Sequence, residues 1–493
     1  RRMTKSKNMI CHIAKKEIYH NRTTLRFGLM IILLPILMIA NALIYGFGNN
    51  GYTADIRDYN RKVDQGRSHI EKYAAQGLGE LAMVGPAEIP KRPPQLKFCA
   101  DGADALIPHS ITIAYRINWE RPEYEDLVES YSWRELWSLE YLPSNHGGDA
   151  TTLIKIDWVF IGVFMSFFVI LFTFDAIAGE RVRGTLSLMM SNPIPRGQVL
   201  FAKYLGTFFT LIIPLLIGVL MNLLIIYLSG NIPFDSGSWL RILGMVGLFA
   251  LHISIFIFLG LFFSSCVSNA ITSLVWLLLT WVCLAFIFPS LLGRFVGTLD
   301  PIPSIERISA EKRLQLANID DEFRPAELVK AAKLSEAPSV DNPSATRRWA
   351  TYFRERSEAQ TRIADARVDQ QLRQVQLTRE LAQISPTACF QYAMEGLANT
   401  GIASYMNFVQ QVRRYRNTFI DFIKSEDRGD PESLHIYPVR EGLSQKLVNP
   451  DAVPRFKEHI SHQSIIFPLG LLILFNILFF IAAQLSFLKC DLK

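Results

Sequence analysis

The sequence predicts an α-helical polytopic membrane protein with six transmembrane helices and two domains outside the bilayer. Three observations predict this class. Half of the 493 residues are hydrophobic and only 19% are charged. Six apolar runs are long enough to cross a hydrocarbon core of about 30 Å, and two of the segments between them are large enough to fold as domains. A disordered chain, a fibrous protein and a disulfide scaffold are excluded by this composition.

The six apolar runs are the predicted transmembrane helices. They occupy residues 27–45, 153–174, 204–229, 239–264, 270–292 and 464–488. The third to fifth runs together make up the segment 204–292. Their few ionisable residues lie near the ends, as the cost of a charge in mid-membrane requires, and only His252 lies near a centre. No small-residue cleavage site follows the first run, so we expect it to be retained as a helix.

Basic residues predict the orientation of the chain. Residues 1–26 carry eight Lys and Arg residues and one acid, Glu17. Because basic loops stay in the cytoplasm, both termini, including the tail 489–493, and the loop 175–203 are predicted to be cytoplasmic. Residues 9–25 are predicted to form an amphipathic helix at the membrane surface. Much of the net charge of +6 then comes from basic residues of the cytoplasmic segments that face anionic lipid. It does not indicate a nucleic-acid partner.

The segments 46–152 and 293–463 are predicted to lie outside. In the first, apolar and polar residues alternate over Ile107–Trp119, which predicts a strand, and Leu127–Leu139 favours a helix. We therefore expect a small mixed α/β domain. The second is predicted to be mainly helical, with mixed charges along its helices and a break at Ser385-Pro386. Its expected helices are Glu311–Leu334, Thr346–Ile384 and Tyr392–Lys424.

Of the six cysteines, only Cys99 and Cys389 fall in the predicted outer segments, one in each. A disulfide between them and two separate thiols are both open.

Motifs for catalysis and metal binding are absent from the sequence. It has no G-x-x-x-x-G-K-[ST] phosphate loop, no C-x-x-C or H-E-x-x-H spacing and no G-x-S-x-G elbow. We therefore predict no catalytic residue, no metal site and no cofactor in this chain, which is not expected to be an enzyme. Two polar residues within predicted spans, Asn222 and His252, could line a substrate path or form hydrogen bonds between helices.

The most informative segment is the loop after the second run, Asp-Ala-Ile-Ala-Gly-Glu-Arg-Val-Arg-Gly-Thr-Leu-Ser-Leu-Met-Met-Ser-Asn-Pro-Ile-Pro-Arg from residue 175 to 196. Glu180–Met190 is predicted to form one short amphipathic helix with Glu180, Arg181 and Arg183 exposed. Pro193 and Pro195 would end it, and Arg196 and Lys203 are predicted to anchor at lipid headgroups.

This loop resembles that of the permease subunits of ABC type-2 transporters, which has an acidic-basic start, Gly-Thr-Leu, a Ser-x-Pro-x-x-Arg turn and a Lys before the next span. The resemblance implies an exporter-type bundle and a coupling helix that seats in an ATPase subunit. The residues that it assigns to coupling are Glu180, Arg181, Arg183, Gly184, Thr185, Leu186, Leu188, Ser191, Pro193, Arg196 and Lys203. The insertion before the last span, with Ile384-Ser-Pro-Thr and Asp451-Ala-Val-Pro-Arg-Phe, is similar to that of a bacterial subfamily of these permeases.

The resemblance implies two ABC ATPase subunits that bind ATP and Mg, and a second permease, either identical or related. It also implies a multi-pass protein of the bacterial inner membrane. The leading hypothesis is substrate export driven by those ATPases. The alternative is a mechanical or scaffolding ABC complex that acts on an extracytoplasmic protein through the large outer segments.

Overall fold

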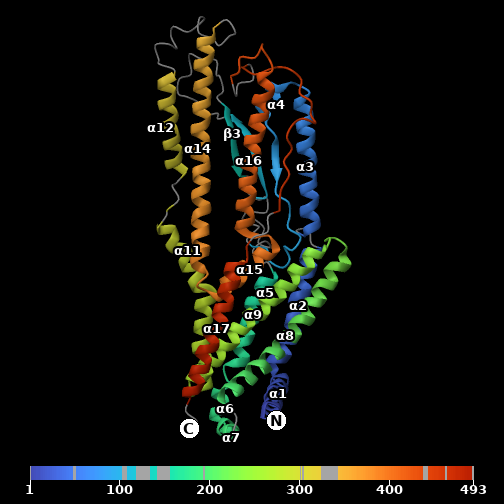
Figure 1. Cartoon of the computed structure of the whole chain (residues 1–493), viewed down its shortest axis with the longest axis vertical. Helices are drawn as coiled ribbons and strands as arrows, with labels where there is room; N and C mark the ends of the chain where they lie inside the picture. The colour runs from blue at the N-terminus through green and yellow to red at the C-terminus, as the bar shows by residue number, and fades with distance from the viewer. Residues whose placement is uncertain are drawn as a thin grey trace.

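The computed structural model shows an elongated molecule with a helix bundle at one end and a large body stacked on it (Figure 1). We call these parts the bundle and the distal body. Both chain termini lie at the end of the bundle that is remote from the distal body, which we call the terminal end. The structure describes residues 2–47, 51–102, 108–117, 134–141, 156–191, 195–299, 301, 305–323, 342–436, 442–460 and 464–490.

Six helices in the described residues are long and apolar enough to cross a membrane, as predicted. They are α2 (Leu25–Phe47), α5 (Trp158–Thr173), α8 (Arg196–Ser229), α9 (Ser236–Cys266), the continuous α10 (Ala270–Val282), η3 (Cys283–Ile287) and α11 (Phe288–Leu299), and α17 (Ile466–Lys489). In their most apolar windows, 67% of α9 is buried, against 11% of the helix from α10 to α11. The bundle is therefore built around α9, and α10 to α11 present a broad apolar face for lipid.

A polar network fixes three of these helices inside the bundle. The amide of Asn222 in α8 donates to the carbonyl of Met38 and to Asn41 Oδ1, each at 2.7 Å, and its oxygen accepts from Trp158 Nε1 at 3.3 Å. Asn41 in turn donates to the carbonyls of Phe98 and Ile156. All the polar atoms of the Asn222 side chain have partners, which favours the hydrogen-bond role over the substrate-path role for this residue.

The distal body contains a three-stranded antiparallel sheet in the order β1-β2-β3. Its strands are β1 (Ala87–Pro90), β2 (Ser110–Ile117) and β3 (Arg134–Tyr141). β2 confirms the strand predicted over Ile107–Trp119 for its described part. The helix predicted over Leu127–Leu139 is wrong from residue 134, where the chain pairs with β2 in the register Ile113↔Leu139, and residues 127–133 lie outside the described residues. Pairing along an existing strand overrides the local helix preference.

Helices of both predicted outer segments form the rest of the distal body (Figure 1). They are α3 (Tyr52–Ala74), α4 (Leu78–Val84), α12 (Ile305–Phe323), α14 (Pro343–Ala382) and α16 (Gly401–Arg428), with α12 packed on α14. α12 and α14 confirm two of the predicted helices within the described residues. For the helix predicted over Glu311–Leu334, the described residues end at Phe323. The helix predicted over Tyr392–Lys424 is instead interrupted, because Asn399 and Gly401 have φ of 58° and 74°, a left-handed conformation that ends a helix.

The two outer segments do not form separate domains, in contrast to the prediction. Ile70, Leu81 and Ile89 of the first share one hydrophobic core with Phe408, Phe419 and Val453 of the second. Each segment supplies part of this core, and alternation along the sequence cannot show which distant segment covers a face.

A short helix of the second segment, α15 (Pro386–Ala398), packs into the bundle. The break at Ser385-Pro386 is confirmed, and Ser385 Oγ donates to the carbonyl of Leu284 at 2.5 Å. The ring of Phe390 stacks on His252 of α9 with centroids 4.3 Å apart. A Cβ on Gly162 of α5 would lie 2.4 Å from this ring, so the glycine makes room for it. The distal body is thereby joined to the centre of the bundle.

Cys99 and Cys389 are both buried, and both are free thiols. Cys389 Sγ donates to the carbonyl of Gln383 at 3.0 Å. The disulfide considered from the sequence is therefore absent, and the two-thiol alternative describes the structure.

Asp157 lies immediately outside the span, at the junction of α5 with the distal body. It is 9% exposed, and its carboxylate accepts from the backbone N–H groups of Phe160 at 2.8 Å and Asp101 at 3.0 Å. Burial raises the pKa of this carboxyl to about 6. The two hydrogen bonds oppose that rise, while the nearby charges of Asp101 and Glu395 add to it.

Replacing Asn222 by Leu should destabilise the bundle, because Trp158 and Asn41 lose buried hydrogen-bond partners. We expect a loss of about 1–3 kcal/mol of unfolding free energy, measured by thermal or denaturant unfolding of the purified protein in detergent. The control is Leu220→Ala on the same helix, whose side chain is 65% exposed. Equal stability of the Asn222 variant and the wild type would contradict the structural role.

The raised pKa of Asp157 predicts pH-dependent stability. Since the folded-state pKa of about 6 exceeds the ordinary value of 3.8, the stabilisation is complete below pH 3.8 and is lost as the pH rises through 6. Asp157→Asn can still accept from the Phe160 N–H as a helix cap but loses the second acceptor, for the Asp101 N–H, and cannot ionise. We expect the stability of the variant relative to the wild type to rise as the pH increases through about 6. Parallel melting-temperature profiles for the two proteins would argue against this.

Candidate functional site

The loop singled out in the sequence forms two short helices at the terminal end, α6 (Ala178–Val182) and α7 (Thr185–Met190). The single helix predicted over Glu180–Met190 is therefore wrong. It is interrupted at Gly184, whose φ of 71° is a left-handed conformation that L side chains rarely adopt. Gly184 thus turns the chain between the two helices. Pro193 lies outside the described residues, and Ser191 ends α7 as an exposed residue.

Ser264 of α9 attaches the start of α6 to the bundle. Its hydroxyl accepts from the backbone N–H groups of Ile177 and Ala178 and donates to the carbonyl of Phe174, each at 3.0 Å. These contacts satisfy backbone groups that a sharp turn leaves unpaired. Sequence reasoning missed Ser264, since a serine at the end of an apolar run carries no distinguishing local signal.

Two arginines of the loop bind the ends of other spans. Arg181 donates to the carbonyls of Ser265 and Val267, both at 3.4 Å, where α9 ends, and also contacts Cys490 Sγ. Arg196 donates to the carbonyls of Leu488 at 2.7 Å and Cys490 at 3.1 Å, where α17 ends. The last carbonyls of a helix lack partners and carry partial negative charge, which a guanidinium satisfies. Arg196 is thus a helix-end ligand in this structure and not the predicted headgroup anchor.

A buried ion cluster joins this loop to two further helices. Lys203 of α8 is 1% exposed, and its Nζ lies 3.1 Å from Glu180 Oε2 and 3.4 Å from Glu17 Oε2. The headgroup anchor predicted for Lys203 and the exposure predicted for Glu180 are both wrong, because the two side chains neutralise each other away from solvent. We call Lys203, Glu17 and Glu180 the ion cluster.

Glu17 belongs to α1 (Arg2–Arg22), the N-terminal helix. The helix predicted over residues 9–25 is confirmed as far as Arg22, but it also packs directly on α8. A Cβ on Gly206 would lie 2.6 Å from Glu17 Cβ, so a glycine is required at this contact. Glu17 is the only acid in a basic segment, and this was the signal that could have identified it as a buried partner.

The side chains of the loop that remain exposed include apolar ones. Val182 is 71% exposed and Leu188 is 72% exposed, whereas Leu186 between them is 1% exposed and packs into the bundle. Arg183 and Thr185 are also exposed, and Thr185 Oγ1 donates to the carbonyl of Glu180 at 3.2 Å. We call Val182, Arg183, Thr185, Leu188 and Ser191 the exposed loop face. An apolar face at a helix tip, held on a buried base, is suited to docking on another protein.

His252, the other polar residue predicted inside a span, is fully buried between Phe256 and Phe390. Neither ring nitrogen has a hydrogen-bond partner in the described part of the chain. It is therefore part of the packing of α15 against α9. No group of three metal-ligating side chains occurs among the described residues.

The fold and the site define a polytopic helical membrane protein with a loop at its terminal end that is held to the bundle at its base and exposed at its tip. A comparison with protein families matches residues 11–492 to the family described as ABC-2 family transporter protein. The chain therefore belongs to the ABC-2 transporter family, which confirms the resemblance inferred from the loop. Members are multi-pass membrane components that work with ATPase partners and are not themselves the ATPase. A comparison with curated proteins finds no match.

Removing the cation of the ion cluster should loosen α1 and α6 from α8. Lys203→Met leaves Glu17 buried without its counter-ion and leaves Glu180 with only Lys16, at 3.7 Å. Breaking a buried ion pair in this way costs about 3–5 kcal/mol. We expect a lower melting temperature and faster proteolysis of α1 in the purified protein.

The matched control is the triple variant Lys203→Met, Glu17→Gln, Glu180→Gln, which removes all the buried charges together. We expect it to recover most of the lost stability. If the triple variant is no more stable than Lys203→Met, the loss comes from packing and the electrostatic explanation fails.

Proposed function

We propose that this chain is the membrane-spanning permease subunit of an ABC-2 transporter, which couples ATP hydrolysis by two separate ATPase subunits to substrate export. The observation that carries this proposal is the exposed loop face, with Leu188 and Val182 presented at the tip of a loop whose base is bound to the bundle. ATP and Mg are bound by the partner subunits in this proposal. The basic N-terminal segment supports a cytoplasmic position for both termini, in a bacterial inner membrane.

The contacts of the loop suggest how a push on it would reach the spans. Ser264 and Arg181 attach it to α9, Arg196 attaches its end to α17, and Lys203 attaches Glu180 to α8. A displacement of α6 and α7 is therefore shared by three helices. Since packed elements move as rigid bodies and interfaces have discrete arrangements, closure of the ATPases would shift the helices together.

A second permease, identical or related, would complete the transporter. The helix from α10 to α11 is the least buried span of the bundle, and its apolar face leaves room for such a partner as well as for lipid.

The mechanical alternative is also supported by a specific observation. The core of the bundle includes Phe98, Cys389 and Phe390 from the outer segments, so the distal body is packed into the spans and does not hang from flexible linkers. A motion of α9 would then be transmitted to an outer protein bound by the distal body, without transport of a small molecule.

The docking role of the exposed loop face can be tested with charge substitutions. We expect Val182→Asp and Leu188→Asp to weaken binding of the ATPase subunits by about 2 kcal/mol or more, about thirtyfold in affinity, because each buries a charge in an apolar contact. The measurement is co-purification of P-loop ATPases from host membranes, with ATPase activity of the recovered complex.

Leu447→Asp is the matched control, since Leu447 is 75% exposed in the distal body. It should retain the ATPases. Retention by the Leu188 and Val182 variants as well, with normal melting temperatures, would refute the proposed docking face. In vesicles containing the intact complex, ATP-dependent accumulation of a substrate would distinguish export from the mechanical alternative.

A further inference from the structure

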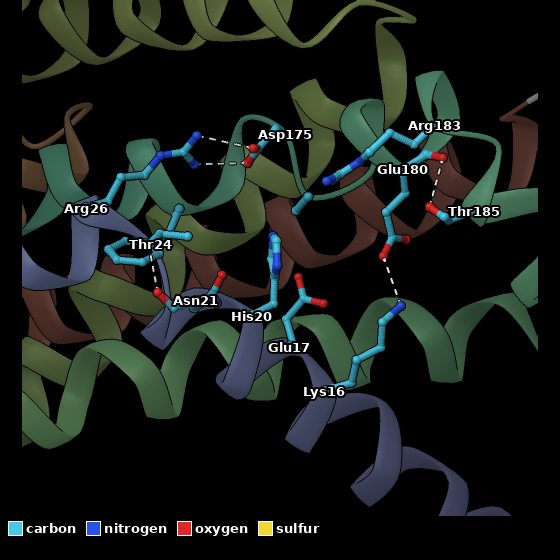
Figure 2. Close-up of a pocket in the computed structure, with 12 residues that line it drawn as sticks. Lys16, Glu17, His20, Asn21, Thr24, Arg26, Asp175, Glu180, Arg183 and Thr185 are labelled. Atoms are coloured by element: carbon cyan, nitrogen blue, oxygen red, sulfur yellow. Dashed lines mark hydrogen bonds and ion pairs between the residues drawn. The ribbon is translucent and has the colours of Figure 1, made fainter.

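A cavity of about 370 Å³ lies between α1, the start of α2 and the turn from α5 to α6 (Figure 2). Its lining includes Lys16, His20 and Asn21 from α1, Arg26 from α2, and Asp175 and Arg183 from the loop. The cavity lies at the level where α2 begins and α5 ends. In a membrane, that is the depth of the lipid headgroups.

The acids around this cavity are committed to other partners. Asp175 pairs with Arg26 at 3.2 Å, and Glu17 and Glu180 pair with Lys203. Glu180 also pairs with Lys16 at 3.7 Å (Figure 2). Three lining cations, Lys16, Arg26 and Arg183, balance these three acids, and Lys203 behind them adds one further positive charge. The site therefore has an excess of positive charge even with His20 neutral.

Several donors that line the cavity are not used by the protein. His20 and Arg183 form no ion pair among the described residues, and Arg183 donates only from Nε to the carbonyl of Gly179. In Figure 2 the His20 ring and the Arg183 side chain both extend into the space between α1 and the loop. Arginine is the side chain best suited to bind a phosphate with two donors at once.

A buried donor provides the second, independent observation. Asn21 is 5% exposed, and its Nδ2 is buried without a hydrogen-bond partner in the described residues. An unsatisfied buried N–H costs about 1–3 kcal/mol unless a ligand accepts from it. Because Asn21 lines the cavity, an anion in the cavity is in a position to accept that hydrogen bond.

We propose that this cavity binds the phosphate group of an anionic phospholipid. The phosphate would accept from Arg183, Asn21 and His20, while Lys16 remains paired with Glu180. The lipid is favoured as the source of the phosphate because Leu25 and Leu29, which follow the cavity along α2, are 80% and 55% exposed and offer an apolar track for an acyl chain. Basic pockets between transmembrane helices are suited to such headgroups.

A lipid in this place would contact both α1 and the loop. Its phosphate would add a bridge between Asn21 and Arg183 next to the ion cluster, since Glu17 and Glu180 also line the cavity. This inference goes beyond the proposed function, and it needs no ATPase, since binding is a property of the chain alone.

The test is lipid binding by the purified full chain in a neutral detergent. We expect dioleoylphosphatidylglycerol to raise the melting temperature and to give a bound-lipid adduct in native mass spectrometry, whereas dioleoylphosphatidylcholine and inorganic phosphate give neither at the same concentrations. Arg183→Gln and His20→Gln should each weaken the phosphatidylglycerol effect, for Arg183 about tenfold in apparent affinity. Both side chains are exposed, so both variants should fold.

Arg22→Gln is the matched control, because Arg22 is exposed at the end of the same helix and does not line the cavity. It should change the apparent affinity less than twofold. Three results would overturn the proposal: equal effects of the two lipids, an effect of inorganic phosphate without one of phosphatidylglycerol, or equal losses in the Arg183 and Arg22 variants. No ATPase takes part in this lipid-binding test. A negative result would therefore not contradict the proposed docking role of the exposed loop face, which is tested separately by the Val182 and Leu188 variants.

Discussion

The ion cluster is the constraint on which the terminal end of the molecule depends. A lysine that is 1% exposed can remain charged only if acids lie beside it, and here the acids come from two other elements, Glu17 in α1 and Glu180 in α6. Lys203 is the shared partner of both acids, so its loss would leave two buried carboxylates side by side. The cluster therefore fixes α1 and the loop relative to α8, and it explains why Gly206 lies on α8 where the two helices approach each other most closely.

Helix ends provide the second constraint at the same place. The carbonyls that end α9 and α17 need donors, and Arg181 and Arg196 supply them from the loop. Arg196, which the sequence predicted to be a headgroup anchor, thus donates hydrogen bonds to the end of a helix in the bundle instead. The apolar side chains of Val182 and Leu188 at the tip of the loop stay exposed among the described residues. This division between a bound base and an exposed tip is the feature on which the proposed coupling role rests.

The sequence predicted the features that depend on local composition. The six spans, the strand at Ser110–Ile117, the break at Ser385-Pro386 and the identity of the loop all follow from runs, alternation or motif order. It could not predict features that arise from contacts between distant segments. The partners of Lys203, the role of Ser264, the pairing of Arg134–Tyr141 and the shared core of the two outer segments each depend on tertiary packing. Gly184 is intermediate, because a glycine within a short amphipathic pattern signals a break that the apolar pattern alone obscures.

The position of α15 bears on both functional alternatives. Phe390 occupies space that Gly162 leaves open and stacks on His252, so α5, α9 and α15 form one packed unit across the boundary between the bundle and the distal body. Close packing transmits displacement, because a ring held at van der Waals distance on two sides cannot stay in place while its neighbours move. Any rearrangement of α9 that begins at Ser264 must therefore either carry α15 with it or separate α15 from the bundle. The first result would move the distal body against an outer partner, and the second would open the interior of the bundle toward it.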